Sequence, residues 1–138
     1  MHTERQSAAL RSLEDVAPRP ALDAVLRGLR SRCPACGEGP LFAKNLKTHD
    51  HCPSCGEELH HHRADDLPAY LNIFVTGHVV VGAMMMVMAL EILGMWTLTA
   101  ATIAVGLVAA IALMRPLKGM VVGLQWALRM HGFGGDES

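Results

Sequence analysis

The sequence predicts a small membrane protein, in which an N-terminal four-cysteine zinc ribbon precedes an α-helical hairpin of two membrane spans and a C-terminal interfacial helix. Three observations lead to this fold class. The chain of 138 residues is 51% hydrophobic and only 18% charged, which excludes a disordered chain. Glu91 is the only charged residue between positions 67 and 114. All four cysteines, with nine of the twelve Lys and Arg residues, lie in the first 66 positions.

We expect residues 1–19 to form a flexible polar segment without a secretory signal peptide, because no charged stretch followed by an apolar stretch and a cleavage site is found there. The first third of the chain is then expected in the reducing cytosol, where disulfides are rare. A domain over residues 20–66 follows, and it opens with apolar residues at helical spacing. These residues are Leu22, Val25, Leu26 and Leu29. Two interpretations stay open, namely a helix packed on its own domain and a basic amphipathic helix on an anionic membrane surface.

Two copies of the motif C-P-x-C-G give the strongest local signal. They are Cys33-Pro-Ala-Cys36-Gly37 and Cys52-Pro-Ser-Cys55-Gly56, with fifteen residues between Cys36 and Cys52. Each motif places two sulfurs on one side of a tight turn, which proline and glycine favour. The intervening residues 38–51 are long enough for a short hairpin. This spacing is typical of a zinc ribbon.

We therefore predict that Cys33, Cys36, Cys52 and Cys55 bind one structural zinc ion. An iron site and a redox-active thiol pair are the alternatives, and iron is less favoured than zinc. Four thiolates leave no open coordination position, so the site is expected to fold the segment rather than to catalyse a reaction. Neighbouring histidines, His49, His51 and 60–62, could also bind metal, although we favour a polar linker.

Two uncharged runs, residues 73–90 and 92–114, are each close to the length of about 20 residues that crosses a bilayer. We place the spans at about 70–92 and 97–114, within a hairpin over residues 67–115. Pro116 is expected to end or kink the second span. Residues 116–138 then form an interfacial helix, with Trp126 as its anchor, and a fraying tail.

Basic residues set the predicted orientation in a bacterial inner membrane. Arg63 precedes the first span, Arg115 and Lys118 follow the second, and the connecting turn has no basic residue. Both termini and the zinc ribbon are therefore expected in the cytoplasm. Within the first span, His78 is a candidate functional residue because ionisable groups are costly at that depth. A hydrogen bond from His78 to the second helix is the structural alternative.

The order of these motifs resembles the bacterial membrane family called domain of unknown function 983. The residues that carry the resemblance are the C-P-x-C-G pair, Arg63-Ala64-Asp65-Asp66-Leu67-Pro68-Ala69-Tyr70, Gly77-His78, Leu117-Lys118-Gly119 and Leu124-Gln125-Trp126. The resemblance covers residues 27–133. The family's activity is not established. In alphaproteobacteria, genes of the family often lie among cytochrome c oxidase genes, and the resemblance therefore implies a role in oxidase biogenesis.

The segment around Asp65, Asp66 and Tyr70 has two interpretations. Asp65 and Asp66 precede a helix N-terminus, where negative charge is favoured, and Pro68 suits the first turn. We favour a cap that fixes where the ribbon joins the membrane, with Tyr70 at the interface. The alternative is a paired-carboxylate site at the membrane surface.

We expect a non-enzymatic protein that presents a cytoplasmic surface to a membrane-protein partner complex, and that assembles or stabilises a respiratory complex. The first alternative is a membrane enzyme or carrier that uses His78, Asp65 and Asp66 for proton, metal or haem handling. A membrane-tethered ribbon that binds nucleic acid ranks last, because the ribbon lacks a basic face rich in aromatic residues. The bilayer is the one partner that composition implies, and the oligomeric state is left open.

Overall fold

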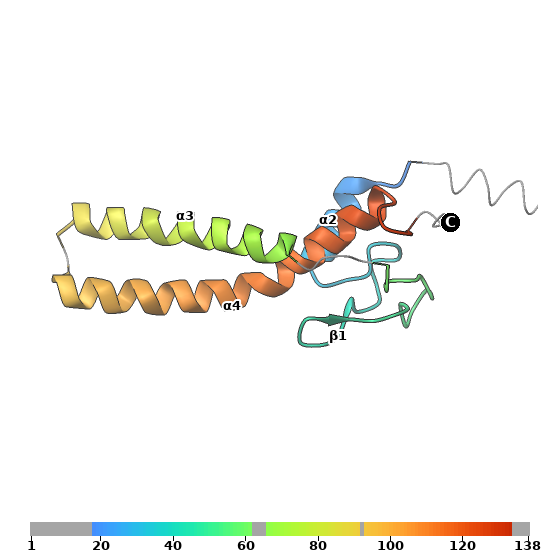
Figure 1. Ribbon diagram of the computed structural model, residues 1–138, viewed down its shortest axis with the longest axis horizontal. Coiled ribbons are helices and arrows are strands. Elements are labelled where there is room, and N and C mark those ends of the chain that lie inside the picture. Colours follow the sequence, from blue (N-terminus) through green and yellow to red (C-terminus); the bar gives the residue numbers. More distant parts are fainter. Residues whose placement is uncertain (1–17, 62–65, 92, 134–138) are drawn as a thin grey trace, which may run out of the picture.

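The computed structural model describes residues 18–61, 66–91 and 93–133. Its elements are α2 (Ala21–Leu29), β1 (Phe42–Lys44), β2 (Lys47–Thr48), α3 (Leu67–Ala89) and α4 (Met95–Ala127). Figure 1 shows an elongated molecule, with α3 and α4 side by side at one end and α2 at the other. We call residues 30–61, which hold both C-P-x-C-G motifs, the cysteine segment. Most of the predicted flexible segment 1–19, Asp65 and the end of the predicted tail lie outside the described residues.

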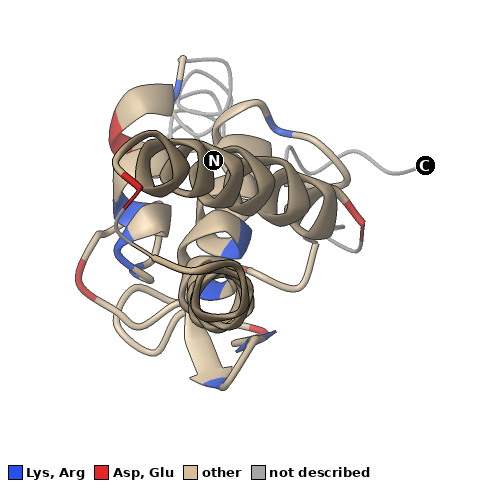
Figure 2. Cartoon of the chain, turned by 90° about the vertical axis from the view of Figure 1, so that its left-hand side faces the viewer, with Lys and Arg blue, Asp and Glu red and all other residues tan. Residues whose placement is uncertain are grey.

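The two long helices confirm the prediction of two apolar elements joined by a short turn. Both are long and apolar enough to cross a membrane, and only 6% and 0% of their most apolar windows are buried within the protein. Figure 2 looks along the hairpin and shows scarcely any charged residue on it, whereas Lys and Arg gather on the part behind. Pro68 lies in the first turn of α3, as the sequence predicted.

A buried amide joins the two helices near the base of the hairpin. Asn72 is only 4% exposed. Its Nδ2 donates to the carbonyl oxygen of Ala110 at 2.9 Å, and its Oδ1 accepts from the Thr76 hydroxyl at 3.1 Å. In an apolar setting, such bonds favour one pairing of the helices. Further along, Gly106 leaves room for the side chain of Val80.

Helix α4 does not end at Pro116, and the prediction of a separate helix over residues 116–138 is wrong. Pro116 lies inside a single helix of 33 residues. Because proline has no N–H to donate to the preceding turn, the helix can change direction there, and Figure 1 shows α4 bending beyond the base of the hairpin. At 1.5 Å per residue, α4 is about 50 Å long and α3 about 35 Å. The last turns of α4 therefore extend past α3.

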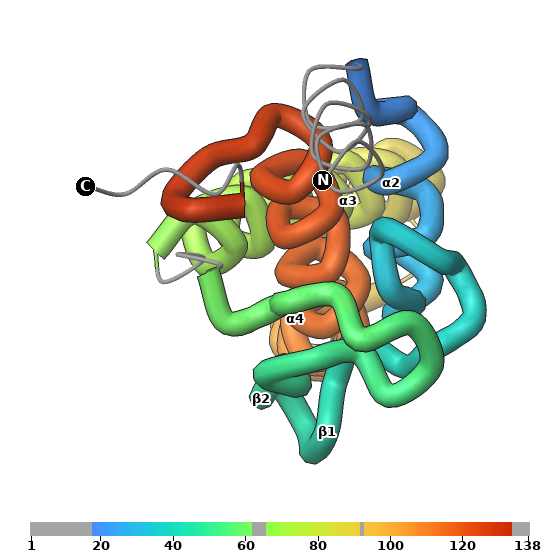
Figure 3. Tube along the Cα trace, turned by 90° about the vertical axis from the view of Figure 1, so that its right-hand side faces the viewer, coloured from blue at the N-terminus to red at the C-terminus, as the bar shows by residue number. Residues whose placement is uncertain are grey.

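These last turns of α4 form part of the protein core rather than an interfacial helix. The cluster of buried residues joins Val121, Val122 and Trp126 of α4 to Leu41 and Leu59 of the cysteine segment. Figure 3 shows the end of α4 between α2 on one side and the cysteine segment on the other. The side chains of Val121, Val122 and Trp126 are therefore covered by protein.

Trp126, which the sequence predicted as a membrane anchor, is a buried core residue. Its side chain is only 7% exposed. Its indole Nε1 donates to Glu57 Oε1 at 2.8 Å, and Glu57 directly follows the second C-P-x-C-G motif. Because a buried indole N–H needs an acceptor, this contact fixes the end of α4 to the cysteine segment.

Helices α2 and α4 cross with their backbones in contact. A Cβ atom on Gly28 would overlap the carbonyl of Gly119, and one on Gly123 would overlap the carbonyl of Ala24. Small residues four apart on both helices permit this close approach. Helix α2 thus packs within the protein, but through Ala24 and Gly28 rather than through the leucine stripe that its spacing predicted. Leu22 and Leu26 are 72% and 42% exposed.

Candidate metal centre

The two C-P-x-C-G motifs fold into tight turns of the same form. The amide of Gly37 donates to the carbonyl of Cys33 at 2.9 Å, and that of Gly56 donates to the carbonyl of Cys52 at 2.9 Å. Gly37 and Gly56 have φ values of 74° and 76°. Only glycine adopts this left-handed conformation without a steric cost. The C-P-x-C-G motif predicted this conformation at both glycines. We call residues 33–37 and 52–56 the first and second knuckles.

Backbone pairing closes each knuckle at its base. Arg32 pairs with Pro40 around the first knuckle, and His51 pairs with Glu58 around the second. Between them, β1 and β2 form an antiparallel pair in which Phe42 lies opposite Thr48. The stretch between the motifs therefore contains a short two-stranded hairpin, as its length allowed.

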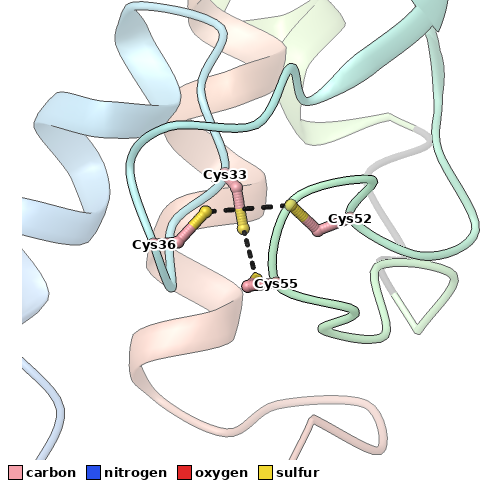
Figure 4. Close-up of side chains that lie close together, drawn as sticks. All are labelled: Cys33, Cys36, Cys52 and Cys55. Atoms are coloured by element: carbon pink, nitrogen blue, oxygen red, sulfur yellow. Dashed lines mark hydrogen bonds between the residues drawn. The ribbon is translucent and has the colours of Figure 1, made fainter.

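The four cysteine sulfurs converge on one point, as Figure 4 shows. The Sγ atoms of Cys33 and Cys55 are 3.8 Å apart, and those of Cys36 and Cys52 are also 3.8 Å apart. All four sulfurs lie within 4.8 Å of one another. Four thiolates bound tetrahedrally to zinc at about 2.3 Å stand about 3.8 Å from each other. The donor set and its spacing therefore fit one tetrahedral metal ion shared by both knuckles.

The surroundings of the thiols differ. Cys33 and Cys52 are buried, whereas Cys55 is exposed. Burial raises the pKa of the Cys33 thiol, and partial desolvation raises the pKa of the Cys55 thiol. Without a bound cation, both thiols therefore keep their protons at neutral pH. A metal ion that displaces these protons would also stabilise the resulting thiolates through its positive charge.

Backbone amides supply part of the site's positive potential. The N–H groups of Gly39 and Glu38 point at Cys36 Sγ, at 3.5 and 3.4 Å. The hydrogen bond from Gly39, with a smaller contribution from Glu38, lowers the pKa of Cys36 to about 7. Gly39 has a second role, because a Cβ atom there would overlap the sulfur of Cys52.

Arg27 of α2 holds the first knuckle in place. Its guanidinium Nη1 donates to the carbonyls of Pro34 at 3.1 Å and Ala35 at 2.9 Å. The cysteine spacing does not predict this role, because Arg27 is six residues before Cys33 and outside the C-P-x-C-G motif.

Among the described residues, the other candidates Asp66, Tyr70 and His78 form no shared site with one another. Asp66 stands at the N-cap of α3 without a side-chain capping bond, and Tyr70 is 70% exposed. His78 Nδ1 donates to its own helix, at the carbonyl of Phe74 (2.7 Å), and not to α4. Twelve residues of helix, about 18 Å, separate Asp66 from His78. Asp65 lies outside the described residues.

The fold and the site define a protein with a four-cysteine metal-binding-like cluster followed by two candidate membrane helices. The model of a family described as "Protein of unknown function (DUF983)" matches residues 42–126. The match covers more than half of the chain, which therefore belongs to this family, as the resemblance predicted. The matched range is narrower than residues 27–133, which the resemblance covers, since the match starts after Cys33 and Cys36. No curated protein and no solved structure matches the chain.

Proposed function

We propose that this chain is a bacterial inner-membrane protein in which one structural zinc ion folds a cytoplasmic ribbon onto a two-span helical hairpin. The convergence of four thiols within 4.8 Å supports the metal. The closed, all-thiolate donor set favours a structural role over catalysis. Zinc is favoured over iron because the ribbon form and the spacing of the two knuckles are typical of structural zinc.

The shared core is the observation that carries this proposal. Leu41 and Leu59 of the cysteine segment and Val122 of α4 are fully buried in one cluster. A bilayer core is about 30 Å thick, so α4, at about 50 Å, is long enough both to cross it and to enter the ribbon. One helix thus links the membrane hairpin to the metal site without a flexible joint.

Charge distribution supports an orientation with the ribbon in the cytoplasm. Arg115 and Lys118 follow the apolar part of α4, and Lys118 Nζ donates to the carbonyl of Leu46 at 2.7 Å. The described residues of the turn between α3 and α4 include no basic side chain. Basic residues favour the cytoplasmic side of a bacterial membrane.

We propose that the assembled ribbon presents its surface to a membrane-protein complex, and that it acts as an assembly or stabilising factor without catalysis. Exposed Leu22 and Leu26 on α2 offer apolar contacts beside the ribbon. The gene association described with the family resemblance makes cytochrome c oxidase the first complex to test.

Affinity purification of the full chain from its native membrane, after mild cross-linking and solubilisation, tests this proposal. Mass spectrometry should identify the same membrane complex with the wild-type chain and with His78→Ala. Cys52→Ser should lose the complex because the ribbon no longer folds. Capture that is unaffected by Cys52→Ser would contradict the proposal.

A membrane carrier or enzyme is the second candidate, and the environment of His78 favours it. His78 lies in an apolar groove lined only by α3, with Gly77 and Gly82 open beside it. Because Nδ1 donates to a carbonyl, the neutral ring has its lone pair at Nε2, where a proton, a metal or a donor group could bind. Loss of function in His78→Ala, with the partner complex still captured, would favour this candidate.

A further inference from the structure

We propose that Glu58, His60 and His61 form a second, exchangeable site for a divalent transition-metal ion beside the four-cysteine site. One donor atom from each residue lies within 4.8 Å of the other two. His61 Nε2 and Glu58 Oε2 are already 2.8 Å apart. This cluster shares no ligand with the cysteine site and could bind its own ion.

The backbone directs these side chains to one place. Leu59 is fully buried, and its amide donates to the carbonyl of Asp50 at 2.8 Å. Its neighbours Glu58 and His60 are both exposed, as expected when side chains alternate about a buried position. The cluster therefore stands on the solvent side of a residue that the core holds in place.

A further imidazole lies close to the cluster. The ring centroids of His60 and His61 are 4.0 Å apart, and those of His51 and His60 are 5.7 Å apart. His51 is paired through its backbone with Glu58. His51 therefore lies beside the three donors without being one of them.

The chain that follows α4 restricts His61. The ring of His61 packs edge-on against Phe133, with centroids 5.8 Å apart, and Phe133 is 5% exposed. Gly132 has a φ of 92°, and a Cβ atom there would lie 2.7 Å from His61 Nδ1. A partly ordered ligand loses less side-chain entropy when metal binds.

The donor set determines the class of ion. Imidazole and carboxylate ligands suit zinc and other late first-row divalent metals. Three protein ligands leave at least one coordination position to water, unlike the closed set of four thiolates. Because Glu58 and His60 are also exposed, the ion in this site should exchange with solution, whereas the ion in the cysteine site should not.

Cobalt titration of the full chain in detergent tests the proposal. The chain carries no polyhistidine tag, and its four thiols are first loaded with zinc. One equivalent of Co²⁺ should bind, and its visible spectrum should lack thiolate charge-transfer bands. The double variant His60→Ala with His61→Ala should weaken cobalt binding at least about tenfold and should keep the first zinc ion by elemental analysis.

Two further variants distinguish loss of the metal site from loss of folding. His60→Gln changes only an exposed side chain and should also weaken cobalt binding at least about tenfold. His49→Ala, which removes a histidine outside the cluster, should leave cobalt affinity unchanged. The proposal is overturned if the zinc-loaded wild-type chain binds no cobalt, or if His60→Gln and the double variant bind it as tightly as the wild type.

Discussion

Trp126 joins three parts of the molecule through one residue. Its indole donates to Glu57 beside the second knuckle, and its carbonyl accepts from Arg19 Nη1 at 2.8 Å. The Arg19 guanidinium also lies 4.4 Å from the centroid of the indole ring. Such contacts between a cation and an aromatic face contribute about 0.5–1 kcal/mol at exposed sites and more when desolvated. Trp126 therefore links α4, the cysteine segment and the residues before α2.

Replacing Trp126 by Phe should destabilise the protein by about 1.5–3 kcal/mol, because the hydrogen bond to the Glu57 carboxylate is lost while most of the apolar contact remains. Thermal unfolding in detergent, followed by circular dichroism, measures the change. Trp96→Phe is the matched control, since Trp96 is 86% exposed at the start of α4. If both substitutions lowered the stability by the same amount, Trp126 would not have this linking role.

Replacing Cys52 by Ser should abolish stable metal binding and the fold of the cysteine segment. Structural zinc contributes about 10–16 kcal/mol to small zinc domains, which is comparable to the whole stability of a typical domain. Zinc content after a mild chelator wash, together with limited proteolysis, tests this outcome. Ser54→Ala changes a residue of the same knuckle that is not a ligand, and it should retain the zinc. A Cys52→Ser chain with full zinc content and unchanged protease resistance would contradict the site.

At the scale of elements, the crossing of α2 and α4 organises the end of the molecule that holds the four cysteines. Gly28 and Gly119 touch through their backbones, so neither position tolerates a side chain without a shift of the helices. Arg27, one residue earlier, bonds to the first knuckle. The position of α2 on α4 therefore also sets the position of the four-cysteine cluster.

Gly28→Ala should destabilise the protein by about 1–3 kcal/mol through overpacking at this crossing. Gly77→Ala is the matched control on α3, where an added methyl group meets nothing within 4 Å. Alanine also has the higher helix propensity, by about 1 kcal/mol, so the control should be neutral or stabilising. Chemical denaturation of both variants in the same detergent compares them. Destabilisation of both by the same amount would show that the crossing is not tight.

Local patterns predicted some elements and not others. The two apolar runs and the paired knuckles are signals contained within single segments, so they could be predicted without tertiary contacts. The continuation of α4 could not, because proline within a helix costs about 3 kcal/mol. Burial of Leu117, Val121 and Val122 offsets this cost, at about 1.5–3 kcal/mol for each side chain. That burial depends on α2 and the cysteine segment, which are distant in sequence.

Contacts between distant segments also determine the parts of the site that local patterns do not predict. The spacing of the cysteines predicted four ligands, but the role of Arg27 depends on how α2 docks, which no local spacing encodes. The leucine stripe of α2 does not mark the face that packs on α4, because small residues form that face instead. Ala24 and Gly28, and likewise Gly119 and Gly123, are four residues apart, and this pattern could have indicated a close crossing.

At the scale of the whole molecule, one long helix connects the exposed apolar hairpin with the buried core around the cysteine segment. The apolar part of α4 lies beside α3, and its last turns are enclosed by α2 and the cysteine segment (Figure 3). We infer that the metal site stabilises the ribbon, and that the ribbon in turn covers the end of the helix. Removal of the ion should therefore expose Val121, Val122 and Trp126.

Metal removal offers a direct check of this coupling. Stripping the ion with a strong chelator should shift the fluorescence of Trp126 toward that of a solvent-exposed indole, and restoring zinc should reverse the shift. A Trp96→Phe background leaves Trp126 as the only tryptophan of the chain. Unchanged fluorescence after complete metal removal would show that the core does not depend on the ion.

The central claim, a structural zinc ribbon fixed to a membrane hairpin, is tested most directly by the zinc content of the chain recovered from membranes. Inner membranes are washed with alkaline carbonate to remove peripheral proteins and with a mild chelator to remove exchangeable ions. The account predicts that the chain stays in the membrane fraction with one zinc ion per four cysteines. Recovery of the chain in the soluble fraction, or of a membrane-bound chain that holds iron or no metal, would contradict it.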